Sequence, residues 1–351
     1  MAKVARLRDV ALAAEVSVAT VSRFVNGSLN LPPTTAKRIE RAILMLNYRP
    51  NPHARRLSLG RSDTIGLVIP AVANPFFAQL ADAVELAAET WGVGVLLCLS
   101  RNQLQRELEY LALLRSNYVD GLLFLTNRTD TGALSTAINT AGHVVVVDED
   151  IPNVAVPKIF ADNVQGGKFA GEHLLQVGHR KLAFIGGQIG MLSTTERLAG
   201  FRRAIALQPG GAVVQELHCD YSAAAGRAAA DALIDQSDAT AVFITSEVVA
   251  LGVLERLRER NVAVPLDLSL VTFDDVGSLH LFAPPLTAIR QPVADMAARA
   301  VALLMAHIAG TTSPDQQPVR LPVELVSRGS VAPPRVKNLA RSATPKERAL
   351  A

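Results

Sequence analysis

Cysteine is scarce in this sequence of 351 residues, with only Cys98 and Cys219 present. Two cysteines cannot supply a disulfide framework or a four-ligand zinc site. No apolar run approaches the ~18–20 residues that a membrane helix needs, since stretches such as 93–99 and 144–147 have the length of a strand. Four of the first nine residues are charged, where a secretory signal needs an apolar core. We therefore expect a soluble cytoplasmic protein with no membrane segment, metal ion or cofactor.

Disorder is also excluded for most of the chain, because 49% of the residues are apolar and only 19% are charged. The charge is unevenly distributed. Residues 1–61 hold eleven Lys or Arg against three acids, a net charge of +8, whereas residues 62–331 carry −9 and residues 332–351 carry +4. A basic head on an acidic body indicates a polyanion-binding module joined to a part that binds another ligand.

The head has the pattern of short helices. Ser17 is a plausible N-cap for a helix over 18–26 that ends at Gly27, and Thr34 for a third helix after Pro32. From Thr64 onward, apolar strand-length runs alternate with helical stretches, which predicts parallel sheets covered on both faces. About 265 residues of this pattern exceed one doubly wound sheet and suit two, with a crossing near residues 153–161.

The first two helices have helix-turn-helix spacing. We expect a small core of Val10, Val16, Val21 and Ile39. The second helix would enter the major groove with its N-terminal residues against base edges. Arg23 suits a guanine, and Val18 and Ala19 suit thymine methyl groups. Bases or phosphates suit the polar residues Thr20, Ser22 and Asn26. The alternative interpretation is that all of these are ordinary surface residues of a small helical bundle.

Three motifs resemble those of the LacI/GalR family of bacterial repressors. They are Leu7-Arg8-Asp9-Val10-Ala11, Val16-Ser17-x-x-Thr20-Val21-Ser22-Arg23-x-x-Asn26 and Leu46-Asn47-Tyr48-x-Pro50-Asn51-x-x-Ala54-Arg55-x-Leu57. The resemblance extends over about residues 4–330. One departure is Glu15, which stands in the turn where many members have Gly.

The resemblance implies an α/β protein with an all-α helix-turn-helix head and a hinge helix, joined to a two-lobed, doubly wound core like that of periplasmic binding proteins. The implied domains are a DNA-binding head over 1–50, a hinge helix and linker over 51–62, a two-lobed effector-binding and dimerisation domain over 63–330, and a disordered tail over 331–351. The hinge helix would lie in the minor groove, where Leu57 wedges open a base step. Its implied DNA-binding neighbours are Asn51, His53, Ala54 and Arg55.

In the body, the likeness to periplasmic sugar-binding proteins implies a ligand in the cleft between the lobes. Asn74 could bind sugar hydroxyls, and Phe76 and Phe77 could cover the C–H face of a sugar ring, although a Phe pair at a helix start also suits core packing. Asp148 matches an aspartate of ribose-type binding proteins, and Glu149 stands where those proteins have arginine. The resemblance adds six further effector-binding residues: Asp162, Arg197, Tyr221, Ser246, Asp274 and Gln291.

These observations predict a sequence-specific transcriptional regulator, a repressor that binds a palindromic double-stranded operator as a homodimer. Several acids with one arginine suit a neutral sugar or polyol effector, with a nucleobase, nucleoside or sugar acid as the alternatives. A sugar-binding protein or an enzyme without a role on DNA is the rival class. An enzyme is not expected, because no Ser/His or Cys/His constellation or phosphate-loop spacing accompanies the acids.

Overall fold

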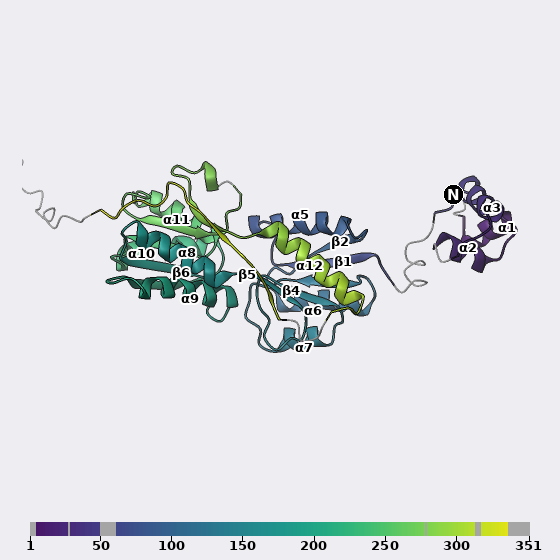
Figure 1. Cartoon of the computed structure of the whole chain (residues 1–351), viewed down its shortest axis with the longest axis horizontal. Helices are drawn as coiled ribbons and strands as arrows, with labels where there is room; N and C mark the ends of the chain where they lie inside the picture. The colour runs from purple at the N-terminus through teal and green to yellow at the C-terminus, as the bar shows by residue number, and fades with distance from the viewer. Residues whose placement is uncertain (1–4, 27–28, 50–60, 278, 313–316, 336–351) are drawn as a thin grey trace, which may run out of the picture. The chain divides into compact units, whose positions relative to one another are not determined.

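The computed structural model describes residues 5–26, 29–49, 61–277, 279–312 and 317–335. The chain forms two compact units, Met1–Ser62 and Asp63–Ala351 (Figure 1). Among the described residues, no helix has the length and apolar character needed to cross a membrane.

The first unit contains three helices, α1 (Leu7–Ala13), α2 (Val18–Val25) and α3 (Pro33–Met45). Ser17 caps α2, because its hydroxyl accepts a hydrogen bond from the Thr20 backbone N–H at 3.0 Å. The expectation that Thr34 caps α3 is wrong: the N-cap is Pro32 and the helix begins at Pro33. Proline suits the first helical position, since it has no N–H to leave unpaired there.

The hydrophobic core of this unit is small and contains the residues that the helix-turn-helix spacing predicts. Val10, Val21 and Ile39 are fully buried, as predicted, whereas Val16 is only partly buried at the edge of the same cluster. These side chains come from all three helices, so their burial fixes how α1, α2 and α3 pack together.

The second unit consists of two lobes, each built on a six-stranded sheet. The N-lobe sheet has the order β11-β5-β4-β3-β1-β2, and the C-lobe sheet has the order β12-β10-β9-β8-β6-β7. The N-lobe strands are β1 (Thr64–Ile69), β2 (Gly94–Leu99), β3 (Gly121–Phe124), β4 (Val144–Val147), β5 (Lys158–Ala161) and β11 (Val319–Leu321). Those of the C-lobe are β6 (Lys181–Gly186), β7 (Ala212–His218), β8 (Ala241–Ile244), β9 (Ser269–Phe273), β10 (Thr287–Arg290) and β12 (Glu324–Val326). The recorded strand pairs are parallel except β10 with β12.

Helices cover the sheets on both faces, as expected for strands that are apolar throughout. The N-lobe helices are α5 (Pro75–Glu89), α6 (Leu104–Arg115), α7 (Ala133–Asn139) and α12 (Val293–Ile308). Those of the C-lobe are α8 (Asn163–Gln176), α9 (Leu192–Ala206), α10 (Ala223–Gln236) and α11 (Glu247–Glu259), and a short 3-10 helix lies at Leu279–Leu281. Within β1, Leu67 faces the cluster that contains α5 and α12, and Val68 faces the cluster that contains α6 and α7.

The chain passes between the lobes three times: from β5 to α8, from β10 to α12, and from β11 to β12. The first crossing follows Ala161, at the end of the stretch where the sequence predicts one. The second crossing returns the chain to the N-lobe, so α12 and β11 belong to this lobe although they follow most of the C-lobe in the sequence. The third crossing then takes β12, the last strand, back to the C-lobe.

The C-terminal tail is ordered further than the sequence predicts. Ala332 exchanges hydrogen bonds with the Ser269 hydroxyl, both at 3.1 Å, and Arg335 pairs with Asp267 at 3.2 Å. Residues 331–335 therefore pack along β9, and the rest of the expected tail, 336–351, lies outside the described residues.

Candidate nucleic-acid interface and effector cleft

Helix α2 presents the residues that the sequence assigns to DNA. Val18 is 43% exposed, Ala19 and Arg23 are exposed, and Thr20, Ser22 and Asn26 are partly buried. Since Val18 is the first residue of the helix, the exposed side chains lie on its first two turns, the part of a recognition helix that reaches base edges. The five predicted hinge residues, Asn51, His53, Ala54, Arg55 and Leu57, lie outside the described residues.

The surface of this unit is strongly basic. Its exposed cations lie on all three helices or beside them, and they are Arg6, Arg8, Arg23, Lys37, Arg38, Arg41 and Arg49. Such a concentration of positive charge attracts phosphate groups irrespective of base sequence.

The turn between α1 and α2 contains the one departure from the family pattern. Glu15 has a φ of +53°, in the left-handed region, directly after the C-cap residue Ala14. Glycine is favoured at this position because a Cβ there costs about 1 kcal/mol. The turn is closed nevertheless by a 3.1 Å hydrogen bond from the Val16 N–H to the Ala11 carbonyl.

In the second unit, the predicted polar residues gather where strands of both sheets end. Asp148 follows β4 of the N-lobe and Asp274 follows β9 of the C-lobe. Both have a left-handed backbone, with φ of +70° and +71°. Such conformations concentrate at ligand sites, and the carboxyl ends of parallel strands are where open α/β sheets bind ligands.

Arg197 is fixed at the centre of this group. Its Nε donates to Asn163 Oδ1 at 2.8 Å, and its Nη1 donates to the Thr245 carbonyl at 2.7 Å. The guanidinium carbon lies 3.6 Å from the centre of the Phe273 ring. The side chain is only 4% exposed, so these contacts hold a buried planar donor group in one orientation.

A close helix crossing puts Arg197 in this place. A Cβ at Gly167 of α8 would lie 1.9 Å from the Arg197 carbonyl oxygen, and one at Gly200 of α9 would lie 1.9 Å from the Val164 carbonyl oxygen. Only glycine at both positions allows the two helix backbones to approach this closely.

The acids around Arg197 tend to hold their protons. Burial raises the pKa of Asp148 to about 7, with the charges of Glu149 and Asp274 adding to the rise and Arg197 opposing it. Burial also raises the pKa of Glu247 to about 7, helped by Asp274 and Asp275. Near neutral pH these carboxyl groups can therefore both donate and accept hydrogen bonds, which suits hydroxyl groups.

Several buried polar atoms beside Arg197 have no partner. Gln291 donates to Asp274 Oδ1 at 2.6 Å, which leaves its own Oε1 unpaired. Asn163 Nδ2, Thr245 Oγ1 and Glu247 Oε2 are also buried and unpaired. Buried polar atoms without partners are costly, so donors and acceptors that converge in this way indicate a place for a polar ligand.

Glu149 makes a different contact from the one expected. It is 2% exposed, and its carboxylate accepts hydrogen bonds from the Ser193 hydroxyl, at 2.6 Å, and from the backbone N–H groups of Leu192 and Ser193. Glu149 of the N-lobe thus caps helix α9 of the C-lobe. Both of its oxygens are engaged there, which places it as a bridge between the lobes rather than as an open ligand contact.

A second bridge joins α9 to the N-lobe. Arg320 of β11 pairs with Glu196 through two hydrogen bonds of 2.6 and 2.7 Å. Two cross-lobe bridges therefore hold the N-terminal turns of the helix that carries Arg197.

Four of the predicted residues have structural roles at helix starts. Asn74 caps α5 by accepting a hydrogen bond from the Phe76 N–H at 2.9 Å, and Asp162 caps α8 by accepting one from the Gln165 N–H at 2.9 Å.

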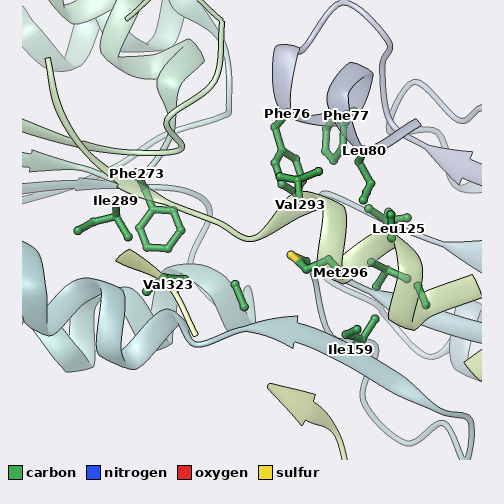
Figure 2. Close-up of a cluster of buried hydrophobic side chains, with 14 of the residues drawn as sticks. Phe76, Phe77, Leu80, Leu125, Ile159, Phe273, Ile289, Val293, Met296 and Val323 are labelled. Carbon is green, nitrogen blue, oxygen red and sulfur yellow. The ribbon is translucent and has the colours of Figure 1, made fainter. Parts of the chain in front are cut away.

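Phe76 and Phe77 are buried in the hydrophobic cluster with Val293 of α12 (Figure 2). The core interpretation of the Phe pair therefore describes their position better than an open aromatic face. Ser246 is buried at the start of α11 and makes no capping hydrogen bond.

Tyr221 lines a cavity of about 500 Å³ between the lobes. The N-lobe contributes the lining residues Asn102, Asn127, Arg128, Thr129 and Thr131. The C-lobe contributes Gln188, Met191, Asp220, Tyr221 and Ser222. Of these ten, the sequence predicts only Tyr221. The other nine residues follow strands β2, β3, β6 and β7. The rule that ligands bind at the ends of parallel strands was therefore the signal that could have identified them from the sequence. No cluster of three or more metal-ligating side chains occurs in the described parts of the chain.

A basic helix-turn-helix unit, followed by two doubly wound lobes with a polar cleft at their strand ends, defines a ligand-responsive DNA-binding regulator. Residues 6–51 match the bacterial regulatory proteins of the lacI family, and residues 172–331 match the periplasmic binding protein-like domain. The chain belongs to the LacI family of bacterial transcriptional regulators, which confirms the predicted family, fold class and role in transcription.

The relatives cover nearly the whole chain. The HTH-type transcriptional regulator DegA of Bacillus subtilis is 32% identical over 93% of this chain and 97% of its own length. The ribose operon repressor of Halalkalibacterium halodurans is 34% identical over 86% of this chain and 90% of its own length. Among solved structures, the lac repressor dimer bound to operator and the anti-inducer ONPF is 26% identical, with a TM-score of 0.81 and coverage of 94% and 100%. The complex of the regulator CelR with cellobiose is 32% identical, with a TM-score of 0.70 and coverage of 93% and 99%. The names of these relatives describe transcriptional regulators or repressors.

Proposed function

We propose that the protein represses transcription in the cytoplasm by binding a palindromic operator as a homodimer, and that a small neutral sugar or polyol in the cleft controls the affinity. The observation that carries this proposal is the group around Arg197, where proton-holding acids and unpaired buried donors and acceptors converge. Such a group matches the mixed donor and acceptor character of hydroxyls and offers no second cation for a phosphate or sugar acid.

On DNA, the exposed residues of α2 would read the bases of each half-site, with Arg23 on a guanine and Val18 and Ala19 on thymine methyls. Residues 51–62 would form the hinge helix and linker, with Leu57 as the wedge in the minor groove. Two heads on a symmetric operator require two copies of the chain.

Exposed apolar side chains on one side of the N-lobe support the dimer. Leu86 of α5 is 64% exposed, Trp91 is 51% exposed, and Leu97 of the edge strand β2 is 42% exposed. The sequence suggests the helices over 76–91 and 103–116 as candidates for the dimer interface, and the exposed residues favour the first of them. We propose that a second copy covers these side chains, because large apolar groups on one lobe that remain exposed to water mark an interaction site.

The sugar class is supported by two relatives whose names state a sugar. One is the ribose operon repressor, and the other is CelR, solved with cellobiose. We propose that closure of the lobes around such a ligand changes the separation of the two heads in the dimer, which alters operator affinity by the difference between the ligand affinities of the two states.

The test is calorimetric titration of the full chain with a panel of sugars, polyols and nucleobases, followed by gel shifts on a palindromic duplex with and without the ligand. Arg197→Ala should abolish ligand binding, whereas the control Arg203→Ala, at an exposed position of the same helix, should leave it unchanged. Binding of hypoxanthine or guanine alone would overturn the sugar assignment. A monomeric protein that ignores palindromic duplexes at low salt would overturn the role on DNA.

A further inference from the structure

The cavity lined by Tyr221 is separate from the group around Arg197, since none of the residues of that group lines it. Its volume is about 500 Å³. At about 30 Å³ for each water molecule, this space corresponds to roughly 17 water molecules. A water molecule has one non-hydrogen atom and a hexose has twelve, so a hexose fits in the same space. The cavity alone can therefore hold one sugar unit.

Neutral hydrogen-bonding groups from both lobes surround this space. Asn127, Thr129 and Thr131 come from the loop after β3, and Gln188 and Ser222 come from loops of the C-lobe. Amides and hydroxyls can each donate and accept, as sugar hydroxyls do.

Each of the two charged lining residues, Arg128 and Asp220, has a partner in the structure. Arg128 lies 3.5 Å from a carboxylate oxygen of the fully buried Glu107, which also accepts a hydrogen bond from Thr126 at 2.8 Å. Asp220 accepts a hydrogen bond from Gln188 at 2.6 Å. With its one cation paired to a buried acid and a further acid in its lining, the cavity offers no excess positive charge for a phosphate or a carboxylate.

One wall of the cavity is suited to the apolar face of a ring. Tyr221 and the nearly buried Met191 line it together. A Cβ at Gly187 would lie 2.5 Å from Tyr221 Cζ and its hydroxyl oxygen, so the aromatic ring is packed against glycine backbone. A ring held in this way gives a fixed surface for the C–H groups of a sugar.

The same tyrosine connects the cavity with the group around Arg197. Its hydroxyl lies 3.3 Å from Thr194 Oγ1, and Thr194 precedes Arg197 by three residues on α9. Residues three apart on a helix lie on one face, so one elongated ligand can contact both places.

We propose that the effector is a disaccharide. One sugar unit binds the group around Arg197, and the second occupies the cavity beside Tyr221. This inference rests on the proposed sugar-responsive function and extends it to a ligand length. Because both lobes line the cavity, the second unit would contact both lobes at once and would favour the arrangement in which they lie this close together.

The test compares disaccharides with their constituent monosaccharides by calorimetry on the full chain. We expect at least one disaccharide to bind 10-fold or more tightly than either of its units. Thr131→Trp, an exposed lining position, should fill the cavity and remove this preference while the monosaccharide affinity changes less than 3-fold. Asn127→Leu, which keeps the side-chain volume and removes the hydrogen bonds, should reduce the preference. Gln208→Trp, at an exposed position away from the cavity, is the matched control and should leave both affinities unchanged.

The outcomes separate the two proposals. Monosaccharides that bind as tightly as any disaccharide, or a preference that survives Thr131→Trp, would overturn the disaccharide and leave the sugar effector standing. Selective binding of a nucleoside would overturn both. If no saccharide of either length binds or alters operator affinity, the proposed function itself fails.

Discussion

The Glu149 carboxylate accepts a hydrogen bond from the Ser193 hydroxyl at 2.6 Å, and this bond joins the two lobes. Glu149 follows β4, whereas Ser193 lies in the first turn of α9. A carboxylate at a helix N-terminus is stabilised by the unpaired N–H groups and by the helix dipole. The contact joins residues of different lobes, so it stabilises the arrangement of the lobes in this structure.

We therefore predict that Glu149→Gln weakens effector binding about 5- to 10-fold. The amide retains one acceptor oxygen but loses the charge that the helix N-terminus favours, so closure becomes less favourable. Titration calorimetry measures the change, with the exposed Glu89→Gln as the control. Unchanged affinity in the Glu149 variant would show that the bridge does not influence closure.

The Arg320–Glu196 pair allows a charge-reversal test. Exposed ion pairs contribute about 0.2–1 kcal/mol, so Arg320→Glu or Glu196→Arg alone should lower effector affinity about 2- to 5-fold. The double variant should recover most of the loss, because it restores the pair in the opposite sense. Affinities at two salt concentrations provide the readout. Losses that simply add in the double variant would contradict a bridge between these two residues.

Asp148 should make the stability of the body depend on pH. Its folded-state pKa of about 7 lies above its ordinary value of 3.8, so the folded protein holds the proton more tightly than the unfolded chain. The free energy of unfolding contributed by this group therefore falls as the pH rises from about 4 to about 7. Asp148→Asn, which tolerates the left-handed backbone, should raise the free energy of unfolding by about 1–2 kcal/mol at pH 8 and change it little at pH 4.

Urea unfolding at the two pH values measures this difference, and the exposed Asp82→Asn is the control. The expected gain in the free energy of unfolding is smaller than the whole pKa shift would give, because the Asp148 side chain is partly exposed and solvent screens its charge. A gain of equal size at both pH values would assign the effect to packing rather than to the proton.

The helix crossing at Gly200 should tolerate no larger residue. Gly200→Ala brings a Cβ to 1.9 Å from the Val164 carbonyl oxygen, which forces α8 and α9 apart. We expect a loss of about 3 kcal/mol or more and a displaced Arg197, so that effector binding fails even where the protein remains folded. Gly94→Ala, whose Cβ would meet only the Asp63 carbonyl oxygen at 3.9 Å, should be nearly neutral. Equal effects of the two substitutions on denaturant unfolding would contradict this account.

Local patterns predicted the fold well, because they depend on neighbours in the chain. The Ser17 cap and the alternation of strands and helices depend on such short-range relationships. The Thr34 cap was wrong because Pro33 already satisfies the first helical position. The left-handed turn at Glu15 was expected only through the family pattern, since its own residue type argues against it.

The site was predicted less completely, because its contacts cross the cleft. Nothing near Glu149 in the sequence shows that a helix start more than forty residues later needs its carboxylate. The Phe76–Phe77 pair has the same sequence pattern whether it faces a ligand or the core, and only the position of α12, over 200 residues away, decides for the core. The cavity residues come from separate loops and carry no motif of their own.

The return of the chain to the N-lobe also governs the order in which the protein can be assembled. Helix α12 and strand β11 are translated after every C-lobe strand except β12, so the N-lobe is left with part of its apolar surface uncovered until residue 321 has been made. Neither lobe is one uninterrupted piece of sequence, and neither can be excised as such. During translation, the basic DNA-binding unit is therefore complete while the two-lobed unit that follows it is still being synthesised.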